Sequence, residues 1–354
     1  MVSSSIPFER FVRLLLARGL GHLYSCDSQP PGRGGILWGA GGLALGLDTM
    51  GRSASSGDLD ELRAQVLSAL QTSVQRDLGR ARRWSPYLSD YAATLLLSRN
   101  WAPQGSGFLP SRIPSAKAVW YRTKRSELFF GAAAVVQTRA LAVEKCPESI
   151  SRLVEDRDWL MKHWLKHPAS TVFGIAHGEL GVALALLNAY LCLGHTPPRP
   201  LLRRVLVARD AARARGRWHP SQQLEGSLCG GMAGAAIVLW LAGHAFEDSS
   251  ILDAGRQLAL HACSYRDLPD LCCGSVGAAL AAHLWTLKQP DPEVACARDA
   301  ALNSAARQTH AFPAIIGLWK GLTGFSLVAH FSCQERLDSL PSLVPATVLR
   351  HLGF

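Results

Sequence analysis

A glycine-anchored segment recurs along this chain at a nearly constant interval. In each copy a Gly-x-x-Gly or Gly-x-x-Ala step opens a strongly apolar run, as in LCGGMAGAAIVLW and LWKGLTGFSLVAHF. The anchor glycines of the six copies are Gly39, Gly131, Gly178, Gly231, Gly274 and Gly321. Their spacings are 92, 47, 53, 43 and 47 residues, and the first is twice 46, so we expect an eroded copy around Asp90. Seven units of about 46 residues then account for the whole chain.

Each unit is predicted to contain two helices. The run after each glycine step is apolar nearly all round, as in a helix buried on all sides, whereas the stretches between the runs, such as 58–78 and 292–308, are amphipathic. The alternating polarity of strands is nearly absent. We therefore predict an all-α fold, a closed α/α toroid of seven two-helix repeats that forms one domain over residues 1–354. An open helical solenoid is the alternative, and the glycines are explained most simply by tight turns and close helix packing.

The cysteines and the N-terminus bear on the cellular compartment. Nine cysteines in 354 residues are too few for a disulfide scaffold, and their number is odd. Glu9, Arg10, Arg13 and Arg18 interrupt the apolar residues of the N-terminus, so we expect no secretory signal. The longest apolar run, 232–243, is far shorter than the roughly 20 residues that cross a bilayer. A cytoplasmic protein with reduced thiols and no transmembrane segment is expected.

Superposing the repeats brings three cysteines together. Cys229 and Cys272 occupy the same position, two residues before their anchor glycines, and Cys273 is the counterpart of His177 one residue before. Three thiolates at helix N-termini, with one position left open, suit a catalytic zinc site. The alternative is that these cysteines are packed core thiols. Because Cys229 stands in register one repeat away from the vicinal pair, we predict a Zn²⁺ site.

The segments GIAHGELG, SLCGG and LCCG resemble motifs of the lanthionine synthetase C-like family, the lantibiotic cyclases. The seven-unit arrangement is similar to the toroid of that family over essentially the whole chain. The resemblance implies that Cys229, Cys272 and Cys273 are zinc ligands, as in the minority of lanthipeptide synthetases with a Cys-Cys-Gly motif. It also implies that His177 is the active-site histidine.

The resemblance further implies an activity. The family joins a cysteine thiol of a precursor peptide to dehydroalanine or dehydrobutyrine, which gives lanthionine or methyllanthionine rings. His177 is then the acid that protonates the enolate, and His219 is the second candidate. Lys320 occupies the equivalent place in the last repeat and is expected to be a surface lysine, with enolate stabilisation as the alternative.

Several positions depart from the family pattern. Leu228 and Gly230 replace a tryptophan and a tyrosine around the first zinc cysteine, and Glu225 stands where an arginine is frequent. The aspartate that pairs with the histidine has no clear counterpart, and Asp90 is a weak candidate. These departures leave a non-catalytic zinc-binding scaffold as the alternative function. A glycosidase or prenyltransferase toroid would need a carboxylate pair or an Asp/Cys/His zinc set, and neither is apparent.

The expected partners follow from charge and from the repeat count. The formal net charge is +10, and seven arginines against one acid lie between Arg199 and Arg217. Such a run is commonly a solvated face, and docking of an acidic leader peptide is the functional alternative. No aromatic-interleaved nucleic-acid motif accompanies it. The repeats leave no room for a dehydratase, and no nucleotide-binding glycine loop is present. A separate dehydratase is therefore expected to supply the dehydrated precursor peptide, and the alternative is that this chain is a piece of a larger synthetase.

Overall fold

The structure is a computed structural model. It describes Arg13 and residues 40–51, 57–79, 85, 87, 90–97, 113–167, 172–214, 224–265, 268–287, 290–308, 318–320, 322–332 and 343–354. Every regular element in these ranges is helical. None of these helices is long and apolar enough to cross a membrane.

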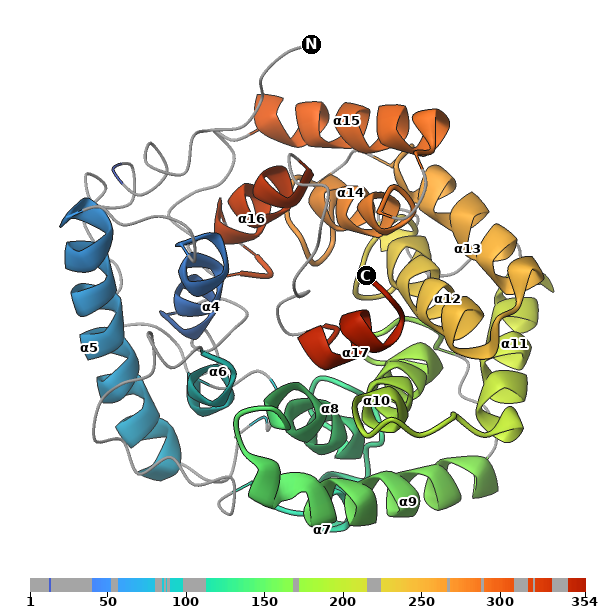
Figure 1. Cartoon of the computed structure of the whole chain (residues 1–354), viewed down its shortest axis with the longest axis horizontal. Coiled ribbons are helices and arrows are strands. Elements are labelled where there is room, and N and C mark those ends of the chain that lie inside the picture. The colour runs from blue at the N-terminus through green and yellow to red at the C-terminus, as the bar shows by residue number, and fades with distance from the viewer. Residues whose placement is uncertain are drawn as a thin grey trace.

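The inner layer is a closed ring of helices, one for each predicted unit (Figure 1). These helices are α4 (Ala40–Met50), α6 (Asp90–Leu96), α8 (Ala132–Ala142), α10 (Glu179–Cys192), α12 (Met232–Phe246), α14 (Ser275–Leu284) and α16 (Leu322–Ser332). Each packs against the next, and α16 packs against α4. The ring excludes an open solenoid, and α6 stands where the eroded copy was expected.

The outer layer consists of the amphipathic helices. They are α5 (Gly57–Gly79), α7 (Ala116–Thr123), α9 (Ile150–Lys166), α11 (Arg199–Ala214), α13 (Ser249–Ala262) and α15 (Pro292–Arg307), and a short 3₁₀ turn, η4 (Pro147–Ser149), precedes α9. Two of them begin at an aspartate cap: Asp248 accepts from Ser250 N and Ile251 N, and Asp291 accepts from Val294 N. The predicted all-α toroid is confirmed.

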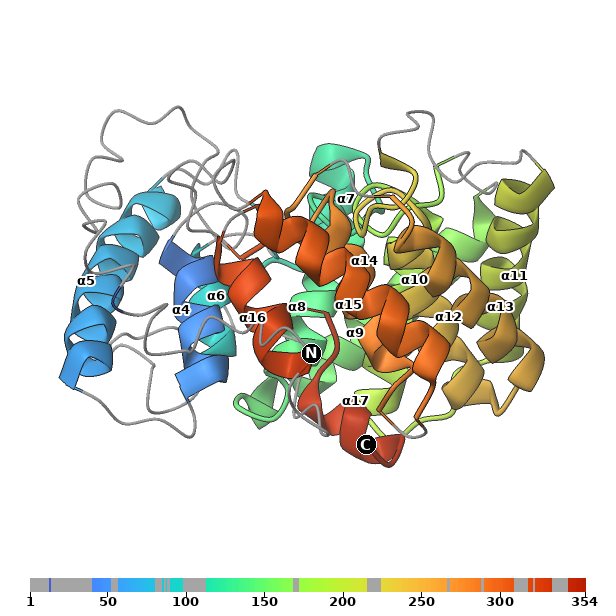
Figure 2. The same ribbon diagram turned by 90° about the horizontal axis from the view of Figure 1, so that it is seen from above.

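The last described helix departs from the two-ring plan. Helix α17 (Ala346–His351) lies inside the ring against α10, toward the end away from the loop that leads into α12 (Figures 1 and 2). Gln137 and Asn188 of the inner helices donate side-chain hydrogen bonds of 2.8 and 2.7 Å to the Leu343 carbonyl. Val348 and Leu349 are buried. The segment 343–354 is thus held by apolar burial and by two amide donors from the inner layer.

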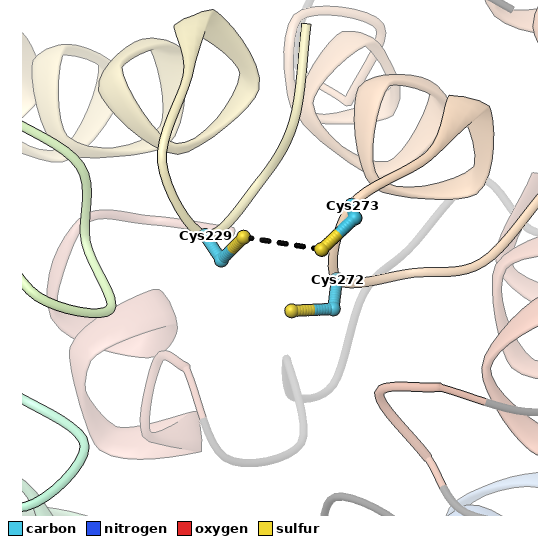
Figure 3. Close-up of side chains that lie close together, drawn as sticks. All are labelled: Cys229, Cys272 and Cys273. Atoms are coloured by element: carbon cyan, nitrogen blue, oxygen red, sulfur yellow. Dashed lines mark hydrogen bonds between the residues drawn. The ribbon is translucent and has the colours of Figure 1, made fainter. Parts of the chain in front are cut away.

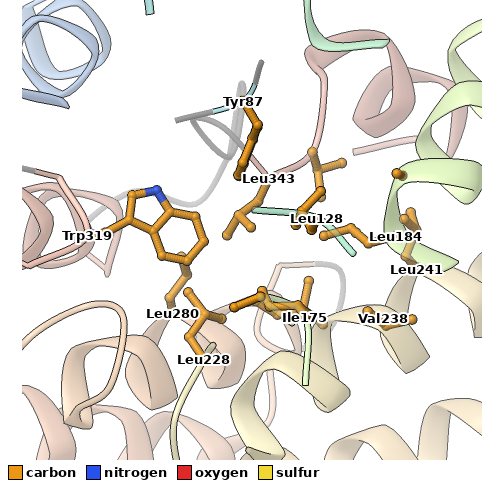
Figure 4. Close-up of a cluster of buried hydrophobic side chains, with 14 of the residues drawn as sticks. Tyr87, Leu128, Ile175, Leu184, Leu228, Val238, Leu241, Leu280, Trp319 and Leu343 are labelled. Carbon is orange, nitrogen blue, oxygen red and sulfur yellow. The ribbon is translucent and has the colours of Figure 1, made fainter. Parts of the chain in front are cut away.

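Apolar side chains fill the interior between the inner helices and the turns that precede them (Figure 4). Leu128, Ile175 and Leu228 lie three residues before successive anchor glycines, and all three are fully buried. Tyr87 and Trp319 belong to the same cluster. A packed interior of this kind holds the turns at one end of the ring in fixed positions.

Candidate metal centre and catalytic site

Backbone hydrogen bonds tie the turns before the inner helices into one row. Phe129 N donates to Ala176 O, Ala176 N to Cys229 O, Cys229 N to Cys272 O, and Cys272 N to Trp319 O, over 2.8–3.1 Å. We call these five residues the turn belt. Each lies two residues before its anchor glycine, so the belt confirms the register in which the repeats were superposed.

Each of these turns also folds back over the start of its own helix. Met232 N donates to Glu225 O and Ser275 N to Leu268 O, both over 2.7 Å. A side chain at Gly231 or Gly274 would collide with the same carbonyl groups. The φ angles of these two glycines, −119° and −128°, are extended, so close backbone approach, not an unusual φ, requires glycine here. The packing explanation of the anchor glycines therefore holds.

The belt brings the three predicted cysteines together (Figure 3). Their sulfur atoms all lie within 4.8 Å of one another, and the Sγ atoms of Cys229 and Cys273 are 3.4 Å apart. Cys272 is buried, and the other two are half-buried. Within the described ranges, this is the one group of three or more metal-binding side chains that lies close enough to share an ion.

The cluster shares negative charge unequally when no ion is present. Hydrogen bonds from Cys229 and Cys272 hold the pKa of Cys273 far below its ordinary value, with a further contribution from the Lys320 ammonium. Hydrogen bonds with Cys229 and with Cys273, together with burial, raise the pKa of Cys272. The Cys229 pKa is also raised, because its bond to Cys273 and its burial outweigh the lowering by Cys272. Cys273 is therefore the cysteine that loses its proton most readily, and an ion bound to all three sulfurs would displace the protons that remain.

The donor set fits zinc. Tetrahedral Zn–S bonds of about 2.3 Å place sulfur atoms about 3.8 Å apart. The three sulfur atoms here lie within 4.8 Å of one another, with 3.4 Å between those of Cys229 and Cys273, so small side-chain adjustments would bring them to that distance. Three cysteine ligands and a half-exposed side leave a fourth position for a further ligand. Cys229, Cys272 and Cys273 are thus the residues that would hold the ion.

Lys320 does not extend into solvent, so the expectation of a surface lysine is wrong. Its Nζ lies 2.7 Å from the Cys273 sulfur and 3.4 Å from Oδ2 of Asp270. Its side chain is only 17% exposed. The sequence did not reveal this contact because Lys320 and Cys273 are 47 residues apart and meet only through the turn belt.

His177 lies in the turn next to that of Cys229, to which Ala176 is hydrogen-bonded. Its ring stacks beside Phe130 with centroids 6.2 Å apart, and its side chain is 57% exposed. Nδ1 lies 3.3 Å from Oε2 of Glu127. Glu127 is itself fixed, because its carboxylate accepts hydrogen bonds from Phe129 N and Phe130 N. This pairing orients the ring with Nε2 on the side away from Glu127.

Glu127, the partner of His177, is a site residue that the sequence did not single out. It lies four residues before its anchor glycine in ELFFG, and Asp270 holds the same place in DLCCG. Each caps its own turn and then reaches the residue before the glycine of the next turn: Glu127 reaches His177, and Asp270 reaches Lys320. Comparison of ELFFG with DLCCG would have indicated from the sequence that Glu127 and Asp270 hold equivalent positions.

The other sequence candidates have different outcomes. His219 and the Asp90 side chain lie outside the part of the chain that the structure describes. Of the arginines between Arg199 and Arg217, Arg204 is turned inward, where it pairs with Glu179 and lies over Trp164.

Among the departures from the motif, Leu228 is fully buried in the interior cluster, and Glu225 caps α12 through its carbonyl.

Comparison with known proteins agrees with this architecture. The family described as lanthionine synthetase C-like protein matches residues 120–330. Among solved structures, the chain is similar to nisin cyclase, with a TM-score of 0.68 and 11% sequence identity over 91% of this chain and 93% of that chain. No curated protein matches the sequence. The structural likeness shows the shared toroid fold, and the family match spans more than half of the sequence. The chain therefore belongs to the lanthionine synthetase C-like family.

Proposed function

We propose that this protein is a zinc-dependent lanthipeptide cyclase, which adds cysteine thiols of a dehydrated precursor peptide to dehydroalanine or dehydrobutyrine. The observation that carries the proposal is the convergence of three cysteine sulfurs within 4.8 Å, in a turn row that also contains His177. Membership of the family and the likeness to a protein named nisin cyclase support the same reaction.

The chain's residues divide the chemistry between them. Cys229, Cys272 and Cys273 would hold the zinc ion, which supplies a Lewis acid that favours the thiolate form of a peptide cysteine. The peptide thiol releases its proton to solvent, its sulfur forms a bond to the β-carbon of the dehydro residue, and the π electrons move toward the carbonyl to give an enolate. His177 donates a proton from Nε2 to the α-carbon and regains one from solvent. The net change is addition of S–H across the double bond.

Glu127 has a positioning role in this scheme. Its carboxylate lies 3.3 Å from Nδ1 of His177 and is locked by two backbone donors. A fixed carboxylate at Nδ1 holds the imidazole in one orientation and keeps Nε2 free for the substrate.

The peptide is expected to meet the arginine face of α11. Arg199, Arg203 and Arg213 are exposed there, while Arg204 is engaged with Glu179. Exposed guanidinium groups attract an acidic leader and raise its association rate. A separate dehydratase would supply the dehydro residues.

The test combines metal analysis with a ring-closure assay. Purified protein should contain about one zinc per chain and should remove alkylatable thiols from a dehydrated peptide faster than buffer does. Cys272→Ala should lose both zinc and activity. Cys296→Ala is the matched control, because Cys296 is exposed on the outer helix α15 and does not belong to the cysteine cluster.

The alternative function is a zinc-binding scaffold without turnover, which the Glu225, Leu228 and Gly230 departures favour. Zinc binding without acceleration of ring closure would identify the scaffold. Absence of zinc from the wild-type protein, or its retention in Cys272→Ala, would overturn the metal assignment.

A further inference from the structure

We propose that Lys320 is a positioning residue of the metal centre, which offsets the additional negative charge of a three-thiolate zinc site through its contact with the Cys273 sulfur. The inference rests on the proposed function only in taking the three cysteines as zinc ligands. It concerns the affinity and the electron density of the metal site, so it can be tested without an active cyclase.

The contact is direct and fixed. Lys320 Nζ lies 2.7 Å from Cys273 Sγ, closer than to any other acceptor recorded for it, and the side chain is 17% exposed. An ammonium so close to a thiolate, in a partly buried place, forms a charge-assisted hydrogen bond. Partial burial also reduces screening by solvent, so the interaction is stronger than that of an exposed surface pair.

Asp270 holds the lysine in this position. Oδ2 of Asp270 lies 3.4 Å from Lys320 Nζ, while Oδ1 accepts a hydrogen bond of 2.6 Å from Cys273 N. The carboxylate therefore fixes both the turn that carries the sulfur and the ammonium that contacts it. Its own negative charge faces an ammonium and a backbone N–H group, whereas the ammonium stands between the carboxylate and the sulfur.

The arrangement repeats the one around His177. Lys320 and His177 both stand one residue before an anchor glycine, and each is held by an acid four residues before the previous anchor glycine. In the order of the turns, His177 lies before the turn of Cys229 and Lys320 follows that of Cys273. An acid-held basic residue therefore stands on each side of the cysteine turns.

The net charge of the proposed zinc site explains why a lysine at this position would matter. A Zn²⁺ ion with two thiolates and a neutral imidazole has no net charge, whereas the ion with three thiolates carries one negative charge. A further thiolate from the peptide meets repulsion from that extra charge. The positive charge of the Lys320 ammonium offsets this extra negative charge. Its hydrogen bond to Cys273 also draws electron density from one of the three sulfurs. Groups that hydrogen-bond to metal ligands commonly change metal affinity by about 10–100-fold.

The first experiment measures zinc affinity by competition with a chromophoric chelator, using the full chain. Lys320→Met should weaken zinc binding by about 10–100-fold, and Lys320→Arg should retain most of the affinity because it keeps the charge. Lys162→Met is the matched control: Lys162 is exposed on α9, and its loss should leave zinc affinity unchanged. Wild-type affinity in Lys320→Met would overturn the inference while leaving the proposed function intact.

The second experiment separates charge compensation from simple structural support. In a Cys273→His background the metal site has no surplus charge, so adding Lys320→Met should no longer weaken zinc binding. Asp270 loses its partner equally in both backgrounds, so its effect cancels in this comparison. An equal loss of affinity in both backgrounds would show that Lys320 only supports the fold of the turn.

A spectroscopic measurement keeps the inference testable if Cys273→His binds metal poorly. Cobalt(II) replaces zinc, and its sulfur-to-metal charge-transfer band reports the electron density on the thiolates. Lys320→Met should shift this band to lower energy, and Lys320→Arg should leave it near the wild-type position. An unchanged band in Lys320→Met would count against the inference, and failure of the wild-type protein to bind either ion would reject both this inference and the metal assignment.

Discussion

The side chain directly before each anchor glycine determines what its turn contributes. Phe130, His177, Gly230, Cys273 and Lys320 occupy this place in five successive turns, on the same backbone frame. The backbone frame fixes the position, and the side chain there is an aromatic ring, an imidazole, none at all, a thiol or an ammonium group. At this scale the proposed chemistry depends on single residues.

Replacing His177 tests the proposed acid. His177→Asn should retain zinc but slow ring closure by about 10²–10⁴-fold, because asparagine cannot donate a proton at neutral pH. Glu127→Gln should slow it less, since the ring remains but loses its fixed partner. Ring closure is followed by thiol alkylation and zinc by elemental analysis. His261→Asn, on an exposed site of α13, is the control, and loss of zinc in His177→Asn would indicate a structural role.

The sequence predicted the clustering of the three cysteines better than it predicted the neighbours of that cluster. Cys229, Cys272 and Cys273 could be grouped because residues in equivalent places of adjacent repeats must lie side by side. Glu127 and Lys320 act across the boundary between two turns, and the repeat register alone does not say how far a side chain reaches. The contacts of Lys320 with Cys273 and Asp270 are therefore visible only in three dimensions.

At the scale of elements, the second glycine of each step sets how closely a turn packs on its helix. A side chain at Gly277 would collide with the Leu271 carbonyl and with the Leu228 side chain. Leu271 directly precedes Cys272, so the fit of α14 against this turn also fixes one of the three proposed ligands.

Gly277→Ala should therefore lower both stability and zinc affinity. We expect a loss of about 1–3 kcal/mol in the free energy of unfolding, the usual cost of an overfilled site, measured by urea denaturation. Zinc affinity should fall in the same variant because Cys272 is displaced. Gly57→Ala is the matched control, since a side chain at Gly57 meets nothing within 4 Å. Equal stability of the two variants would refute this account of the glycine steps.

A buried ion pair joins three helices. Asp156 of α9 accepts from Ala116 N at the start of α7, over 2.7 Å, and from Arg139 Nε of α8, over 2.9 Å. Both side chains are nearly fully buried. Asp156→Ala leaves Arg139 without this partner and should destabilise the fold by about 3–5 kcal/mol. Asp210→Ala, in the exposed pair with Arg209, should change stability by less than about 1 kcal/mol, and a similar loss in both would contradict the prediction.

At the scale of the whole molecule, the repeat predicted the number of inner helices and the closure of the ring. It did not predict the place of α17. A short helix with a few apolar residues suits either layer, and its position depends on the distant donors Gln137 and Asn188. Polar amides within otherwise apolar inner helices were the available sign that something polar enters the ring.

Truncation before Leu343 should destabilise the entire ring rather than one repeat. It removes the burial of Val344, Val348 and Leu349, each worth roughly 1.5–3 kcal/mol, and leaves Gln137 and Asn188 without their shared acceptor. Thermal unfolding should show one transition at a lower temperature. His351→Ala, at an exposed place on α17, should leave the transition unchanged. An unshifted transition in the truncated protein would rule out a stabilising role for this segment.

The turn belt also allows a functional site to be transposed along the ring. Phe129, Ala176 and Cys229 have the same backbone hydrogen-bonding pattern. The same set of metal-binding side chains could therefore be placed on a different pair of neighbouring turns. Phe129→Cys combined with Ala176→Cys would reproduce, two turns earlier, the arrangement of the three cysteines, with native His177 in the third place. For protein engineering, the turns offer structurally equivalent positions, and two substitutions at such positions can install a second metal centre.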